Sequence, residues 1–162
     1  MTFIPEEQYA EMIRVLPVLC VDMILKNDDG EYLLLERKND PGKGSWWPAG
    51  GRVLRGETLE EAAIRKTREE TGLTARNLRP VGYFELFSER GPFGASPMYH
   101  TVSIVFSASV DGREKVTLDG QSADWKYAGE LPADFRVIPF QGPEALHPAR
   151  ERGRVPGRRR GS

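Results

Sequence analysis

The chain has 162 residues, of which 39% are hydrophobic and 29% are charged, a composition typical of one globular domain. No apolar run reaches the roughly 20 residues that a membrane helix requires, and the first residues lack the features of a secretory signal. Cys20 is the only cysteine, which excludes an internal disulfide, and its apolar neighbours predict a buried structural thiol. We therefore expect a cytoplasmic protein that has no membrane partner.

The formal net charge of −1 is unevenly distributed. From His147 onward the sequence has six arginines and one acidic residue, a charge of +5, which leaves −6 on residues 1–146. An acidic body argues against a nucleic-acid-binding protein, which would present a basic surface. We expect one domain over residues 1–146 and a basic, disordered C-terminal tail over residues 147–162, with contact to RNA or an anionic surface as the alternative role of the tail.

The first third of the chain predicts a helix and a β-hairpin. Apolar residues at helical spacing indicate a short amphipathic helix over residues 6–16, and the apolar run 18–26 indicates a strand. The segment Asn27-Asp28-Asp29-Gly30 is typical of a hairpin turn, because these residue types tolerate a positive φ. Residues 31–36 then form the return strand, and Arg37 falls at its end.

A second helix follows a loop that is rich in glycine and proline. Thr58 and Glu61 have the spacing of a capping box, and Gly72 is placed as the residue that ends the helix. Strands are expected over residues 81–88, 98–110 and 123–128, with a final helix after them. The order of elements predicts an α/β fold in which helices cover both faces of a mixed sheet.

Carboxylates and glycines cluster around the second helix in a way that indicates a metal and pyrophosphate site. Gly50 and Gly51 end a strand, Glu57 lies in the following loop, and Glu69 and Glu70 are adjacent near the end of the helix. Two neighbouring carboxylates repel each other unless a cation lies between them, and Mg²⁺ takes one or two carboxylates together with waters and phosphates. Ordinary i,i+4 ion pairs on a solvated helix are the alternative explanation.

This segment resembles the Nudix box, in which glycine, glutamate, arginine and a late glutamate pair occur at fixed distances. The resemblance implies an α/β/α sandwich and the hydrolysis of a nucleoside diphosphate linked to another group, with Mg²⁺ or Mn²⁺ as cofactor. It also implies that Glu69 and Glu70 bind the metal, while Glu57 and Arg65 pair and orient the helix. The matching residues are Gly51, Glu57, Arg65, Glu69, Glu70, Gly72 and Leu73, and the departures are Lys66 and Thr67.

A narrower resemblance over about residues 1–140 is carried by the opening helix and by the segments Leu19-Cys20-Val21-Asp22, Leu35-Glu36-Arg37, Gly44-Ser45-Trp46-Trp47-Pro48, Gly50-Gly51-Arg52 and Asp119-Gly120-Gln121. Together these segments resemble the GDP-mannose mannosyl hydrolase branch. That branch breaks the bond at the sugar carbon and releases GDP and mannose. The resemblance implies that the Gly50 carbonyl, Glu70 and Gln121 bind Mg²⁺. It further implies that Arg37 and Arg52 hold the leaving diphosphate and that Asp22 stabilises charge on the sugar; guanidinium groups suit this task because they match phosphate oxygens.

Two departures affect the expected mechanism. The catalytic histidine of the mannosyl hydrolase branch is replaced by Ser122, and the loss of a general base typically costs about 10²–10⁴ in rate. His100 could face the site, although an ordinary strand histidine is the simpler interpretation, and Asp124 could serve as base or as a residue behind the metal ligands. Lys66 could pair with Glu70 and weaken metal binding, or point at a phosphate; it favours one metal ion over several.

Three hypotheses follow for the function. The first is a nucleotide-sugar hydrolase with one Mg²⁺, the second a general Nudix pyrophosphohydrolase that gives a nucleoside monophosphate, and the third a non-catalytic nucleotide-sugar sensor. We assign Trp47 to substrate binding, although Trp46, Trp47 and Trp125 could equally serve the core or a dimer contact. The opening helix could form a homodimer interface or could simply cover the sheet.

Overall fold

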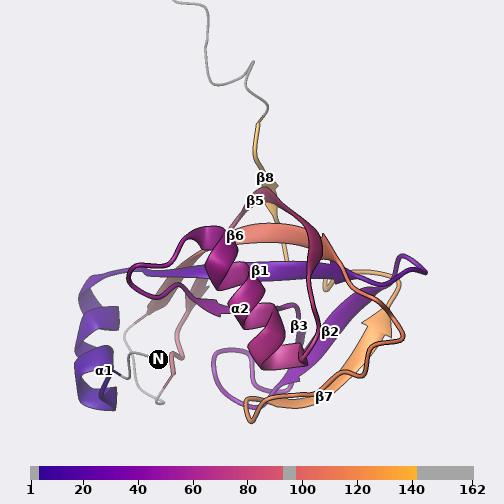
Figure 1. Ribbon diagram of the computed structural model, residues 1–162. Helices are drawn as coiled ribbons and strands as arrows, with labels where there is room; N and C mark the ends of the chain where they lie inside the picture. The colour runs from indigo at the N-terminus through magenta and orange to yellow at the C-terminus, as the bar shows by residue number, and fades with distance from the viewer. Residues whose placement is uncertain (1–3, 93–97, 142–162) are drawn as a thin grey trace, which may run out of the picture.

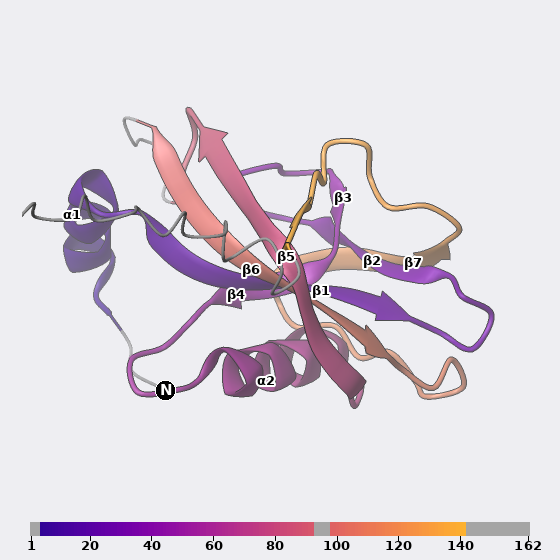
Figure 2. The same cartoon turned by 90° about the horizontal axis from the view of Figure 1, so that it is seen from above.

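An eight-stranded mixed sheet forms the centre of the part of the chain that the structure describes, residues 4–92 and 98–141 of this computed structural model (Figure 1). Two helices accompany it: α2 lies across one face, and α1 lies at the end of the sheet where β1 begins (Figures 1 and 2). The strands are β1 (Val18–Lys26), β2 (Tyr32–Arg37), β3 (Trp46–Trp47), β4 (Ala49–Arg52), β5 (Arg76–Ser88), β6 (Tyr99–Ser109), β7 (Ser122–Ala128) and β8 (Ile138–Pro139), and the helices are α1 (Glu6–Val15) and α2 (Leu59–Thr71).

The strand order is β3-β2-β1-β6-β5-β8, with β4 pairing β1 and β7 pairing β2. The β1–β6 pair is parallel and the other pairs are antiparallel. A parallel pair needs a long crossover connection, and here that connection contains α2. Strands β1 and β2 pair only next to their turn, at Lys26 and Tyr32. Beyond that point β1 pairs with β4, while β2 pairs with β3 and β7.

The alternation of side chains along β1 divides its residues between two sides of the sheet. Val21, Met23 and Leu25 face α2 and pack in the main core with Ala63 and Phe106. The residues between them, including Asp22, point to the opposite side. That side has a second core in which Phe84 and Val105 pack against Phe135, a residue of the loop between β7 and β8.

The structure confirms the α/β class, the mixed sheet and most of the local predictions. β1 has the predicted bounds, and the turn after it is closed by the Gly30 N–H donating to the Asn27 carbonyl at 3.1 Å. Thr58 forms the predicted capping box, and Gly72 ends α2 in the left-handed region at φ 73°. Neither helix of the described residues combines the length and the apolar character that a membrane span requires.

Three features differ from the prediction. β5 begins at Arg76, five residues before the expected position 81, because its first half pairs with the end of β6. The short strands β3 and β8 were not predicted; β3 forms by pairing with the preceding strand β2, and β8 forms by pairing with β5, which is distant in the sequence. Residues 129–141 contain turns and β8 where a final helix was expected, and residues 142–162, with the whole basic tail, lie outside the described residues.

Candidate active site

The sequence of helix α2 fixes both of its ends and thereby the position of its charged face. Thr58 accepts a hydrogen bond from the Glu61 N–H at 3.2 Å, and the Glu61 carboxylate accepts one from the Thr58 N–H at 2.7 Å. The left-handed conformation of Gly72 closes the other end. Lys66 and Glu70, which are one turn apart, are both buried where α2 packs against β4.

An ion pair ties the loop before α2 to the helix. Arg65 Nε donates to Glu57 Oε2 at 2.9 Å, and its Nη2 lies 2.5 Å from Glu57 Oε1. The same Nη2 donates to the Arg52 carbonyl at 3.0 Å, while Glu57 accepts the Leu54 N–H at 2.6 Å. The hydrogen bond from Arg65 lowers the pKa of Glu57. The two residues expected to orient the helix are therefore in two-point contact and connect it to the end of β4.

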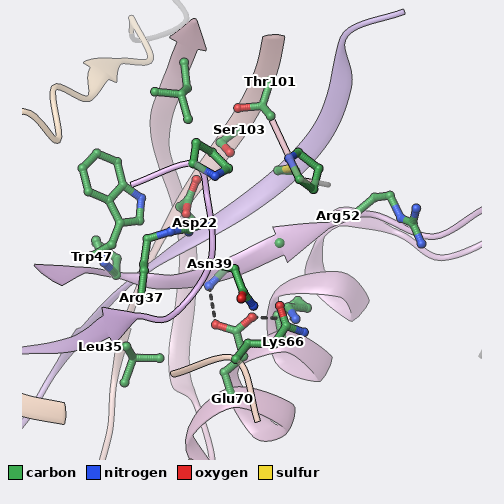
Figure 3. Close-up of a pocket in the computed structure, with 18 of the residues that line it drawn as sticks. Asp22, Leu35, Arg37, Asn39, Trp47, Arg52, Lys66, Glu70, Thr101 and Ser103 are labelled. Carbon is green, nitrogen blue, oxygen red and sulfur yellow. Dashed lines mark hydrogen bonds and ion pairs between the residues drawn. The ribbon is translucent and has the colours of Figure 1, made fainter. Parts of the chain in front are cut away.

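Each carboxylate oxygen of Glu70 has its own partner (Figure 3). Oε2 accepts the Gly50 N–H at 3.0 Å, and Oε1 lies 2.6 Å from the ammonium group of Lys66. Burial raises the pKa of Glu70, although Lys66 and the Gly50 N–H act in the opposite direction. Gly51 has a φ of +152°, and a Cβ there would lie 2.7 Å from Lys66 Cε, so the glycine leaves the space that the lysine side chain occupies.

Asp22 is a second buried carboxylate, placed on β1 opposite Gly50 of β4. A Cβ at Gly50 would collide with its Oδ1, which explains why the strands approach so closely here. Removal from water raises the pKa of Asp22 to about 6; hydrogen bonds from Ser103 and Trp47 lower it, and the nearby Glu70 raises it (Figure 3). Its protonation therefore changes close to neutral pH.

Two arginines stand at strand ends near these carboxylates. Arg37 ends β2, and its Nε is buried without a hydrogen-bond partner among the described residues. Arg52 ends β4, and its guanidinium lies 4.7 Å from the centre of the Tyr9 ring, a cation–π distance that links the site to α1. A buried donor without a partner is costly, so the Arg37 guanidinium is suited to an anionic ligand.

One cleft of about 820 Å³, a volume suited to a small molecule, is lined by both buried carboxylates, both arginines and Lys66. Trp47, Phe84, Leu86 and Tyr99 form apolar parts of its wall. The mixture of arginines and carboxylates suits a ligand that carries an anionic group and a bound cation. The charged and amide residues of the lining are Asp22, Arg37, Asn39, Asp40, Arg52, Arg65, Lys66, Glu69, Glu70 and Gln121.

Comparison with known proteins identifies the family. The family model described as the NUDIX domain matches residues 16–137. The chain belongs to the Nudix family. It is 28% identical over 152 residues, 93% of this chain and 88% of the relative, to the low-salt glycan biosynthesis protein Agl8 of Haloferax volcanii.

A second relative is the ADP-ribose pyrophosphatase of Methanocaldococcus jannaschii, with 38% identity over 117 residues, 72% of this chain and 65% of the relative. Among solved structures, the MutT protein of Methanosarcina mazei Go1 has a TM-score of 0.55 and 27% identity, covering 75% of this chain and 89% of that chain. This Nudix protein is therefore a hydrolase of nucleoside diphosphate derivatives.

Most of the predicted site residues meet in the cleft of this Nudix hydrolase; the exceptions are Asp124 and Glu57, of which Glu57 contacts the cleft residue Arg65. Gly50, Glu69, Glu70 and Gln121 line it together with the two arginines, Asp22 and Trp47. Asp124 is exposed on β7, where its Oδ1 accepts the N–H of the next residue at 2.8 Å, and it does not line the cleft.

His100 does not take the place of the catalytic histidine that Ser122 replaces in this chain. That side chain stacks on Phe87 with ring centres 4.3 Å apart, and its Nε2 lies 3.9 Å from Glu85. Strand alternation sends it to the sheet face opposite Thr101, which lines the cleft. Ser122 is buried in the cleft wall, paired with Arg37 in the register of β2 and β7.

Sequence reasoning missed several residues of the cleft wall. Tyr99, Thr101 and Ser103 alternate along β6, and this period-2 pattern was visible, but its alignment beside β1 was not. Tyr9 enters from α1. Cys20 has the predicted burial and is a free thiol in the cleft wall, where removal from water raises its pKa to about 12 and so suppresses its reactivity.

The donor atoms of the cleft fit one divalent ion better than a cluster of ions. In residues 4–92 and 98–141, no group of three or more His, Cys, Asp and Glu side chains is arranged to hold a metal. Glu70 still offers a carboxylate beside Gly50 and Asp22, and Mg²⁺ commonly takes one or two carboxylates and completes its shell with water and phosphate oxygens. Lys66 shares that carboxylate, so an ion bound there must compete with its ammonium group.

Proposed function

We propose that this Nudix hydrolase acts on a nucleotide sugar, such as GDP-mannose, and releases the nucleoside diphosphate and the free sugar. The observation that carries the proposal is the gathering of Asp22, Arg37 and Arg52 in the same cleft as Glu70 and Gln121. Cleavage at the sugar carbon needs a held diphosphate on one side and a carboxylate for the developing positive charge on the other. The relative from Haloferax volcanii, which aligns over 93% of this chain, is named for glycan biosynthesis and so supports a sugar-linked substrate.

The protein residues divide the work of the proposed reaction. Arg37 and Arg52 bind the diphosphate and offset the charge that grows on it as the sugar C–O bond breaks. Glu70, the Gly50 carbonyl and Gln121 would hold Mg²⁺, which adds positive charge to the same leaving group. The Asp22 carboxylate stabilises the positive charge that develops on the sugar carbon.

The balance of the reaction is simple. The electron pair of the broken C–O bond stays with the diphosphate, the oxygen of a water molecule bonds to the sugar carbon, and the proton of that water passes to solvent. A histidine would normally assist this proton transfer, and the described part of the cleft has none. We therefore expect slow turnover, with a loss of about 10²–10⁴ relative to a site with a general base.

A general pyrophosphohydrolase is the second candidate, because the relative from Methanocaldococcus jannaschii is named as an ADP-ribose pyrophosphatase. Such an enzyme attacks phosphorus and gives a nucleoside monophosphate. A non-catalytic nucleotide-sugar sensor is the third, favoured by the contact of Lys66 with Glu70. We retain Mg²⁺ or Mn²⁺ as the expected cofactor; a related enzyme from Francisella tularensis was solved with AMP and a manganese ion.

Incubation with GDP-mannose and Mg²⁺ in ¹⁸O-labelled water tests the proposal. We expect chromatography to show GDP and free sugar, with the label in the sugar. GMP with labelled phosphate would refute cleavage at carbon and support the pyrophosphohydrolase. No turnover of a panel of nucleotide sugars, dinucleotides and nucleoside triphosphates, with either metal, would support the sensor.

A further inference from the structure

Lys66 is a buried cation at the carboxylate on which the metal site depends. Its side chain is 10% exposed, and Nζ lies 2.6 Å from Glu70 Oε1 and 3.6 Å from Glu69 Oε2. The space next to Gly51 accommodates the side chain, since any larger residue there would meet Cε. The lysine thus occupies a fitted position, and the proposed function assigns it no task.

The contact with Glu70 sets up a competition between two cations. The other oxygen of Glu70 already accepts the Gly50 N–H, so Oε1 is the side of the carboxylate that a metal would approach. An ammonium group at 2.6 Å satisfies that oxygen and repels a second positive charge. A divalent ion in the empty cleft must displace Lys66, whose burial makes it expensive to leave without an anionic partner.

A bound diphosphate offers Lys66 another partner. Lys66 lines the same cleft as Arg37 and Arg52, and its four-carbon chain lets the ammonium group swing within the cleft. Phosphate oxygens carry more charge than one carboxylate and bind ammonium strongly. With the diphosphate present, the Lys66 ammonium group therefore keeps an anionic partner when it leaves Glu70, and the Glu70 carboxylate becomes available to the metal.

We propose that Lys66 is an exchangeable counter-ion that couples metal binding to diphosphate binding: it holds Glu70 in the empty cleft and moves to the diphosphate when a metal ion takes its place. The inference rests on the proposed function only in that the substrate carries a diphosphate. Its consequence is an enzyme that binds metal weakly alone and firmly together with the nucleotide.

The measurable quantity is the ratio of two Mg²⁺ dissociation constants, without and with saturating GDP, after correction for Mg²⁺ bound to free GDP. By linkage this ratio is the coupling between the two ligands. Calorimetric titration of Lys66→Gln should show tighter Mg²⁺ binding without GDP and a ratio that is about tenfold smaller than in the wild type, about 1.4 kcal/mol of coupling. GDP is a product of the proposed reaction and is not consumed.

Arg68→Gln is the matched control. Arg68 lies on the same helix two residues away and is exposed, so its loss changes the net charge equally and should leave the ratio unchanged. Lys66→Met, neutral and of similar length, repeats the test should the glutamine variant fail to fold, and thermal melting verifies folding. A ratio within twofold of wild type in the Lys66 variants, or weaker Mg²⁺ binding without GDP, would overturn the proposal.

The titration separates this proposal from the proposed function. It requires only metal and GDP and gives its answer whether or not the enzyme turns over a nucleotide sugar. Failure of the coupling with normal release of GDP from GDP-mannose would remove Lys66 from the mechanism and leave the function intact. A normal coupling with GMP as the reaction product would do the reverse.

Discussion

The replacement of Asp22 by asparagine should make this enzyme more stable and much less active. Asp22 is 8% exposed, and burial raises its pKa from an ordinary 3.8 to about 6 in the folded state. Because the folded protein disfavours the ionised carboxylate, ionisation at neutral pH costs stability. Asparagine keeps the size and an accepting oxygen for Ser103 and Trp47 while it removes the charge.

The size of the effect follows from the difference between the two pKa values. A rise from 3.8 to about 6 corresponds to about 3 kcal/mol of destabilisation at neutral pH. The asparagine side chain itself costs about 1 kcal/mol of stability, since its amide N–H groups enter a site built from hydrogen-bond donors. We expect a net gain of about 2 kcal/mol at pH 7, which raises the melting temperature by about 6 °C in a protein of this size.

The pH dependence gives the sharper assay. The contribution of the protonated Asp22 carboxyl to the free energy of unfolding is fully present below pH 3.8 and is lost as the pH rises through about 6. Urea unfolding should therefore show an Asp22→Asn advantage that grows between pH 4 and pH 7. Asp29→Asn, in the exposed hairpin turn, should remain within about 0.5 kcal/mol of wild type at both pH values.

A flat pH dependence of the difference between Asp22→Asn and wild type would refute this reasoning. It would mean that Asp22 is hydrated and ordinary in the folded state. Greater stability with unchanged kcat/KM on the substrate would instead separate the buried charge from catalysis. The expected combination, higher stability and lost activity, is the trade-off of a residue retained for function.

Two further predictions concern the ligands of the cleft. Glu70→Gln should abolish metal-dependent turnover and the calorimetric Mg²⁺ signal, because glutamine lacks the charge. The circular dichroism spectrum should stay native, because glutamine still accepts the Gly50 N–H. A wild-type Mg²⁺ affinity in this variant would remove Glu70 from the metal site. Arg37→Ala and Arg52→Ala should each lower kcat/KM on nucleotide sugars more than tenfold, about 1.4 kcal/mol of transition-state stabilisation, and unchanged kinetics in both would end their assignment to the leaving group.

The parts of the site that were predictable from sequence are those defined by short-range spacing. The capping box at Thr58 and the left-handed Gly72 are local motifs, and they determine where α2 begins and ends. Once the helix is fixed, its periodicity places Lys66 and Glu70 one turn apart on the same side. The pairing of Glu57 with Arg65 was expected only from the resemblance to the Nudix box, because Glu57 lies in the loop before the helix and helical periodicity does not place it.

Long-range pairing determined what could not be predicted. Whether a strand residue faces the cleft depends on register, and a shift by one residue reverses every side chain. The parallel alignment of β1 with β6 turns Thr101 toward the cleft and His100 away from it. Asp124 was expected near the site because Gln121 is close in sequence, but β7 passes from the cleft wall at Ser122 to an exposed position at Asp124 within two residues.

The geometry of the cleft is asymmetric with respect to the proposed reaction. Cations that could bind the proposed leaving group are plentiful, since Arg37, Arg52 and Lys66 all line the cleft. The half that must activate water has no histidine in the described cleft, and Asp22 can stabilise the sugar carbon only while it is ionised and not acting as an acid. For the proposed reaction we therefore expect departure of the diphosphate to be the assisted step and attack by water to limit the rate. We accordingly expect the enzyme to select its substrate by the leaving group, and substitution of the two arginines to affect kcat/KM more than it affects folding.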